Sequence, residues 1–81
     1  MPELEGIEVI ARFDGNGWVR PLKVRWEGRV IPVESTGRRW QAEDGLHVLC
    51  MLPGGRVVEL IFQPAELRWY LRTLGRERRA A

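Results

Sequence analysis

The sequence predicts a single mainly β domain, a small antiparallel barrel or rolled sheet of five to six strands. Three observations support this fold class. The chain has 81 residues, which is the length of one domain. Apolar and polar residues alternate in several short runs, and residues that favour turns separate those runs at intervals of roughly ten residues. Many short, evenly spaced strands of this kind are typical of antiparallel barrels and sandwiches.

The first half of the chain contains three expected strands. Residues 7–13 alternate between apolar and polar side chains, which indicates a strand with one buried face. Asp14-Gly15-Asn16-Gly17 follows, and because these residues tolerate positive φ angles they predict a hairpin loop. Residues 22–26 form the second expected strand. Glu27-Gly28 is a candidate two-residue turn, and it leads into a third strand at residues 29–34.

Two further strands follow a polar segment in the middle of the chain. Residues 35–45 are polar and irregular, and we expect a loop there with Trp40 inside it. Residues 46–52 predict the fourth strand and residues 56–62 the fifth. Pro53-Gly54-Gly55 supplies the turn between them.

The C-terminal stretch at residues 64–74 fits two structures. Pro64 can begin a short helix, but the apolar residues after it also alternate as in a strand. We expect residues 1–75 to form the domain and residues 76–81 to be a basic, disordered tail. The predicted core consists of Val9, Leu22, Val24, Trp26, Val48, Cys50, Val58 and Leu60.

The composition predicts a cytoplasmic protein. Cys50 is the only cysteine, which argues against a disulfide-stapled secreted domain. The first residues show no signal-peptide pattern, and no apolar run approaches the roughly 20 residues of a membrane span, so we expect no membrane association. Twelve of the thirteen basic residues are arginine, a bias that indicates a GC-rich genome, a thermophilic source, or both.

No pattern in the sequence predicts catalysis, so we expect neither an enzyme nor a cofactor. His47 is the only histidine, and in a strand it faces away from Cys50, so the two predict no metal site. We interpret His47 as a surface residue and Cys50 as a core thiol whose pKa is raised by burial. Glu43 and Asp44, which precede a glycine, are interpreted as solvated loop residues.

The four tryptophans and their arginine neighbours suggest a surface for single-stranded nucleic acid. Aromatic rings stack on bases and arginines pair with phosphates in such surfaces. The segment of residues 15–42 has a net charge of +4, which would support binding of this kind. The alternative, which the small size of the chain favours, is that the indoles fill the core and arginines pack over them. The candidate nucleic-acid-binding residues are Trp18, Arg20, Lys23, Arg25, Arg38, Arg39 and Trp40.

A rival hypothesis is a structural or protein-interaction domain that forms a homodimer. The strands expected at residues 46–52 and 56–62 are apolar on both faces, so one face of each needs a cover. Either the last element of the chain or a second copy can supply it. The candidate dimer-interface residues are Leu49, Met51, Val57 and Ile61.

The chain also resembles an uncharacterised family of small bacterial domains. The resemblance lies in Trp26-Glu27-Gly28-Arg29, in Arg39-Trp40, in the Gly54–Leu60 hairpin and in Arg68-Trp69-Tyr70-Leu71, and it spans residues 7–74. Members occur alone and as a C-terminal appendage of proteins related to Y-family translesion DNA polymerases. The resemblance implies a small barrel whose last element is a strand, a link to DNA damage tolerance and a polymerase-like partner. It implies no catalytic residues.

Overall fold

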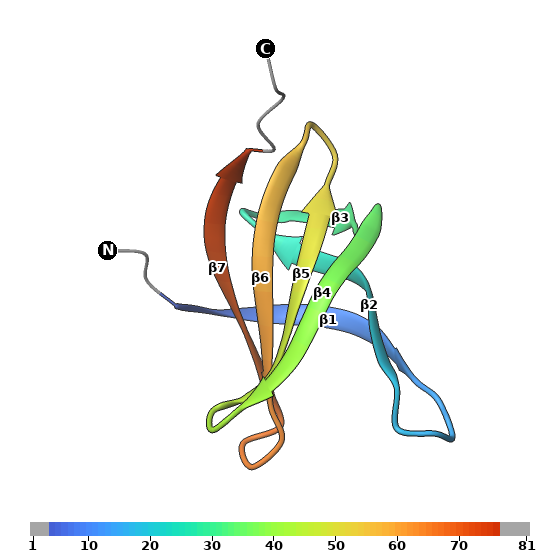
Figure 1. Ribbon diagram of the computed structural model, residues 1–81. Helices are drawn as coiled ribbons and strands as arrows, with labels where there is room; N and C mark the ends of the chain where they lie inside the picture. The colour runs from blue at the N-terminus through green and yellow to red at the C-terminus, as the bar shows by residue number, and fades with distance from the viewer. Residues whose placement is uncertain (1–3, 77–81) are drawn as a thin grey trace.

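The structure is a computed structural model that describes residues 4–76, and within this range it is a single antiparallel sheet of seven strands (Figure 1). The strand order across the sheet is β3-β2-β1-β7-β6-β5-β4. No helix forms between residues 4 and 76, so none there could cross a membrane. The strands are β1 (Glu5–Phe13), β2 (Val19–Trp26), β3 (Arg29–Pro32), β4 (Ser35–Ala42), β5 (Gly45–Leu52), β6 (Arg56–Gln63) and β7 (Arg68–Arg76).

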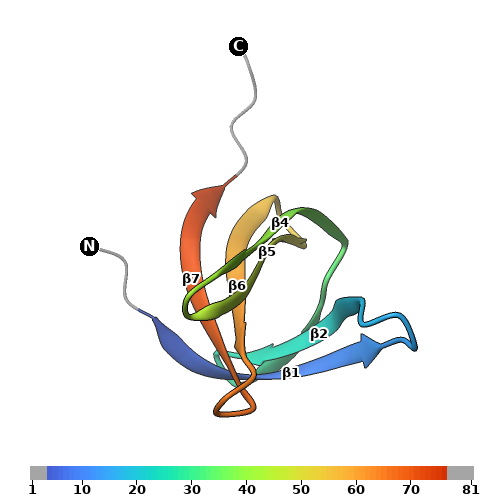
Figure 2. The same cartoon turned by 60° about the horizontal axis from the view of Figure 1, so that its bottom comes forward.

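Strand β1 joins the two halves of the sheet because it pairs with a different neighbour at each end. Residues 5–7 pair with β7, whereas residues 8–13 pair with β2. The sheet therefore turns along the length of one strand, and β1 and β2 pass across the β4–β7 strands (Figures 1 and 2). The result is a half-barrel, which confirms the predicted mainly β, barrel-like antiparallel fold.

The core lies between β2 and the inward face of β5, β6 and β7. Alternation places every second side chain of these strands on that face. Seven of the eight predicted core residues lie in the core or pack against it, with Val9 only partly buried at its margin. The buried residues of the core cluster are Val19, Val24, Trp26, Val48, Cys50, Leu52, Val58, Leu60, Trp69 and Leu71.

Leu22 is the exception, because 37% of it is exposed. The ladder between β1 and β2 changes register after Ile10, which pairs with Lys23 while Ala11 pairs with Pro21. Leu22 is the extra residue of this bulge, so the simple alternation that the sequence suggests is interrupted there. The prediction that Leu22 belongs to the core was therefore wrong.

The prediction of five to six strands was also too low. The segment expected to be a loop at residues 35–45 forms β4, which pairs with β5. This strand is at the edge of the sheet, carries polar side chains on both faces and contains a bulge between Thr36 and Arg39. All three properties remove the alternation by which a strand is recognised in a sequence.

The open choice at the C-terminus is resolved in favour of a strand. Residues 68–76 form β7, which fills the space between β1 and β6 and contributes Trp69 and Leu71 to the core. Arg76, which the sequence assigns to a tail, ends this strand, and residues 77–81 of the predicted tail lie outside the described residues. The predicted turn at Glu27-Gly28 is confirmed, since both residues have positive φ angles of 54° and 76°.

Gly45 begins β5 at a point where the backbone of β6 comes very close. Its φ angle is +134°, and a Cβ atom built on it would lie 2.1 Å from the carbonyl oxygen of Phe62. Only glycine fits such an approach of two backbones. Gly45 therefore allows the turn between β4 and β5 to rest against the end of β6.

We expect Gly45→Ala to destabilise the protein by about 2–4 kcal/mol, because the new methyl group forces backbone atoms apart and strains a positive φ angle. Gly55→Ala is the matched control, since Gly55 also has a positive φ angle, of +75°, but has no atom within 4 Å of the added Cβ. The control should lose only about 1 kcal/mol. Urea unfolding of both variants measures the difference, and equal losses would contradict the close-approach argument.

Candidate functional site

A cluster of four charged side chains occupies the face of the β4–β7 sheet that is turned away from the core. Asp44 lies in the turn between β4 and β5, and His47 follows on β5. His47 Nε2 is 2.7 Å from Asp44 Oδ1, and His47 Nδ1 is hydrogen-bonded to Glu59 Oε2 on β6. Arg72 on β7 donates through Nε to Glu59 Oε1 at 3.0 Å, and its second donor, Nη2, binds the same oxygen. The cluster therefore connects three strands and one turn.

The register of two hairpins brings these side chains together. In the β5–β6 ladder His47 pairs with Ile61 and Leu49 pairs with Glu59, so His47 and Glu59 are diagonal neighbours on one face. Diagonal neighbours are about 7–8 Å apart at the backbone, which long side chains can bridge. In the β6–β7 ladder Glu59 lies directly opposite Arg72.

The two central members of the cluster are removed from solvent. Glu59 is 3% exposed and His47 is 7% exposed. Burial of a charge is costly unless hydrogen bonds and opposite charges compensate it. Here both carboxylate oxygens of Glu59 and both ring nitrogens of His47 are bonded, and no buried side-chain polar atom within residues 4–76 lacks a partner. Removal of one partner would leave an uncompensated buried charge.

The pKa values in the cluster shift in the directions that keep it charged. Burial alone would lower the pKa of His47, but its hydrogen bonds to Asp44 and Glu59 outweigh burial and raise it above the ordinary value of 6.5. Burial alone would raise the pKa of Glu59, but the hydrogen bonds from His47 and Arg72 lower it below 4.5. The hydrogen bond from His47 also lowers the pKa of Asp44.

A row of packed side chains runs beside the cluster across four strands. Trp40, His47, Ile61 and Tyr70 are successive partners in the β4–β5, β5–β6 and β6–β7 ladders. The rings of Trp40 and His47 are stacked, with centroids 5.1 Å apart and planes 20° apart. Ile61 lies between His47 and Tyr70 and is only 1% exposed. This part of the face is therefore a second, smaller packed layer that includes the fully buried Ile61.

The cluster is suited to holding a proton between two carboxylates, because the His47 ring lies between Asp44 and Glu59. Cys50 lies in the core on the opposite face of β5, where burial raises the pKa of its thiol to about 12. Within the described residues, no three His, Cys, Asp or Glu side chains are arranged to hold a metal ion. The hydrogen bonds and ion pairs of the cluster link the β4–β5 turn to β5, β6 and β7.

The sequence analysis missed this cluster. The interpretation of His47 as a surface residue was wrong, and Asp44 is bonded to it rather than only solvated. The signal that could have located the cluster is the turn at Pro53-Gly54-Gly55, because a short turn fixes the register of the strands on either side. That register sets His47 near Glu59 on the non-core face.

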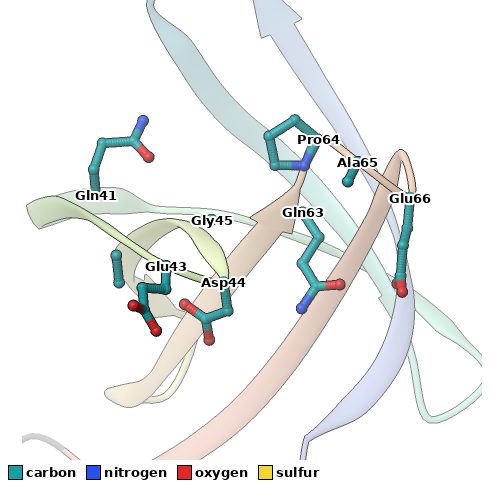
Figure 3. Close-up of a pocket in the computed structure, with 9 residues that line it drawn as sticks. Gln41, Glu43, Asp44, Gly45, Gln63, Pro64, Ala65 and Glu66 are labelled. Atoms are coloured by element: carbon teal, nitrogen blue, oxygen red, sulfur yellow. The ribbon is translucent and has the colours of Figure 1, made fainter.

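A hollow of about 400 Å³ lies beside the cluster, between the β4–β5 turn and the β6–β7 turn (Figure 3). Asp44 lines one side of it, and Gln63 and Glu66 line the other (Figure 3). Glu43 lines it as well, so the hollow is acidic. Two of the three carboxylates stabilise the turns, because Asp44 binds His47 and Glu66 Oε1 accepts a hydrogen bond from the Tyr70 hydroxyl at 2.8 Å.

The outer face of the β1–β2 hairpin is basic, as the sequence predicts for part of it. Arg20, Lys23 and Arg25 of β2 are exposed, and Arg12 of β1 lies directly opposite Arg20. Within the described residues only Arg25 of these four has an ion-pair partner, namely Glu8 at 3.5 Å, and both side chains are largely exposed. We refer to the four residues Arg12, Arg20, Lys23 and Arg25 as the basic face.

Trp18 stands at one end of the basic face, just before β2, and 51% of it is exposed. The guanidinium group of Arg39, on β4, lies over its ring with Cζ 3.7 Å from the ring centroid. Arg39 Nη1 also donates a hydrogen bond of 2.7 Å to the carbonyl oxygen of Val19. A shallow hollow of about 190 Å³ opens beside the indole. Its lining consists of Arg12, Asp14, Trp18 and Arg20.

The seven candidate nucleic-acid-binding residues fall into two groups. Trp40 is half-buried against His47, and Arg38 lies over its ring with Cζ 5.0 Å from the centroid, so these two belong to the face that carries the charged cluster. The other five lie on or next to the basic face. They are Trp18, Arg20, Lys23, Arg25 and Arg39.

The four candidate dimer-interface residues lie on the non-core face of β5 and β6. Leu49, Met51 and Val57 are half-buried and line a hollow of about 140 Å³ next to Gly37. Ile61 is fully buried by its own chain. Of the four, three therefore retain surface that another molecule could contact.

Comparison with known proteins yields no relative. No family model, curated protein or solved structure matches this chain. The functional evidence therefore comes from the basic face and from the half-buried apolar residues on the non-core face of β5 and β6.

The charged cluster predicts how stability depends on pH. Because the pKa of His47 is raised in the folded state, its stabilising effect is complete below 6.5 and is lost as pH rises through the raised pKa. The lowered pKa values of Glu59 and Asp44 act in the opposite direction, so their effect is lost as pH falls below their ordinary values. We therefore expect the free energy of unfolding in urea to fall as pH rises from below 6.5 through the raised pKa of His47.

His47→Gln is the control, because glutamine keeps a hydrogen-bond donor but does not titrate. The difference in stability between the wild type and this variant should shrink as pH rises. A difference that grows with pH would mean that burial, rather than the carboxylate partners, dominates the pKa of His47.

Proposed function

We propose that the protein is a non-enzymatic module that binds nucleic acid through the phosphates that contact its basic face. The observation that carries this proposal is the direct opposition of Arg12 and Arg20 in the β1–β2 ladder. Like charges in directly opposed positions of a sheet destabilise it. Neither residue forms an ion pair within residues 4–76. Asp14 lines the same hollow as these arginines, but its Oδ1 accepts hydrogen bonds from the backbone amides of Asn16 and Trp18, so an external anion would relieve the repulsion between the two arginines.

The rest of this face fits the same ligand. Lys23 and Arg25 continue the line of cations along β2, so several phosphates of one strand could be neutralised at the same time. Ile10 on β1 pairs with Lys23 and Val30 on β3 pairs with Arg25. These two apolar side chains are 51% and 50% exposed and offer contact to sugars or bases. The resemblance to a domain appended to translesion-polymerase relatives suggests the same class of ligand and, with it, a link to DNA damage tolerance.

The test is the salt dependence of binding to a fluorescent oligonucleotide. Affinity should fall as salt rises, and the double variant Arg12→Ala/Arg20→Ala should reduce the slope of log K against log salt by about 1.4, or 0.7 for each lost phosphate contact. Arg38→Ala is the control, because Arg38 is an exposed arginine on β4, on the face that carries the charged cluster rather than on the basic face. No binding at low salt, or an equal effect of both variants, would overturn the proposal.

Self-association is a second candidate function, supported by the hollow that Leu49, Met51 and Val57 line beside Gly37. A second copy could bury this apolar surface, which stabilises by about 25 cal/mol per Å². We expect light scattering to report a mass near twice the 9.4 kDa of the monomer, and Met51→Glu to return it to one chain. A monomer at high micromolar concentration would contradict this candidate without affecting the nucleic-acid proposal.

A further inference from the structure

We propose that Trp18 is a stacking platform for one unpaired base, so that the ligand of the basic face is a single strand. This inference rests on the proposed function and names the form of nucleic acid that it binds. It depends on three properties of Trp18: exposure of the indole, its fixed orientation and its distance from the cations.

Trp18 is the indole best placed to meet a ligand. Trp26 and Trp69 are 6% and 8% exposed in the core, and Trp40 is half-buried against His47. Trp18 is 51% exposed and lies next to the β1–β2 turn, which extends beyond the body of the sheet (Figure 1, lower right).

The indole is held in place from behind. The guanidinium of Arg39 lies over the centre of one face of the ring, with Cζ 3.7 Å from the centroid, and leaves the opposite face for a base. Arg39 also donates a hydrogen bond to the carbonyl oxygen of Val19, which restricts its motion. The backbone of Trp18 is fixed as well. Its amide donates to Asp14 Oδ1 at 2.9 Å, and its carbonyl accepts a hydrogen bond from the amide of Asp14 at 3.0 Å. A platform that is rigid before binding loses little entropy when the ligand arrives.

The hollow beside the indole combines the two features that a nucleotide needs. The hollow of about 190 Å³ adjoins the indole, so a base stacked on Trp18 would lie against the side chains that line it. Arg12 and Arg20 line the same hollow and can bind the phosphate attached to the stacked base. In a duplex each base is already stacked between its neighbours, so only a single strand can offer its base to Trp18.

The experiment compares an oligothymidylate with an abasic oligonucleotide of the same length, which has the phosphates but no bases. Trp18→Ala should weaken binding of the oligothymidylate by about 5- to 150-fold, the range that one base–aromatic stack provides. It should leave binding of the abasic strand unchanged. Trp18→Phe should retain part of the affinity, and circular dichroism should show that both variants keep the wild-type fold.

The outcomes separate this inference from the proposed function. If the wild type binds both strands equally and Trp18→Ala changes neither, the platform is refuted while phosphate binding stands. Equal weakening of both strands by Trp18→Ala also refutes it, because the indole would then act without a base. If neither strand binds at low salt, both proposals fall together. A duplex oligonucleotide of the same length is a further comparison. We expect it to bind more weakly than the oligothymidylate and to be unaffected by Trp18→Ala, and a duplex that Trp18→Ala weakens as much as the oligothymidylate would refute the inference.

Discussion

The fold depends on the division of β1 between two partners. A chain of this length has one sheet with which to make a core, and a flat sheet would leave each face exposed. Because β1 pairs first with β7 and then with β2, the sheet is folded across itself and its two halves face one another. The buried residues of β2 then meet those of β5, β6 and β7 without any second layer of helices. Removal of that shared strand would separate the two halves of the core.

The folded sheet still has a non-core face on β4–β7. Part of this face is occupied by hydrogen-bonded charged side chains. Trp40, His47, Ile61 and Tyr70 form a row of paired side chains across four strands. Beside this row the carboxylate of Glu59 binds both His47 and Arg72. Apolar residues of similar size could have made this layer more cheaply, since a buried ion pair often stabilises no more than a hydrophobic replacement does. The charged partners favour one register of the strands, because Glu59 can bind both His47 and Arg72 in only one alignment of β5, β6 and β7.

Sequence patterns were informative where alternation was strict and failed where a bulge or an edge interrupted it. The strands β5 and β6 lie within two residues of their expected limits, since both have one consistently apolar core face. Leu22 and β4 were misread because bulges change the period of two. Trp18 became a candidate because the tryptophans have arginine neighbours in the sequence. The arginine that stacks on it is nevertheless Arg39 on β4, which no local pattern connects to Trp18. The contact of His47 with Glu59 could not be predicted either, because it depends on the register of the β5–β6 hairpin.

The single thiol gives the protein a built-in reporter of its own opening. Cys50 is 2% exposed at the centre of β5, and a thiol whose pKa is about 12 is almost wholly protonated near neutral pH. A soluble alkylating reagent can therefore reach a reactive sulfur only after β5 has come apart from the strands beside it. The rate at which Cys50 is alkylated therefore reports how often the core unfolds locally or globally, and no introduced probe is needed.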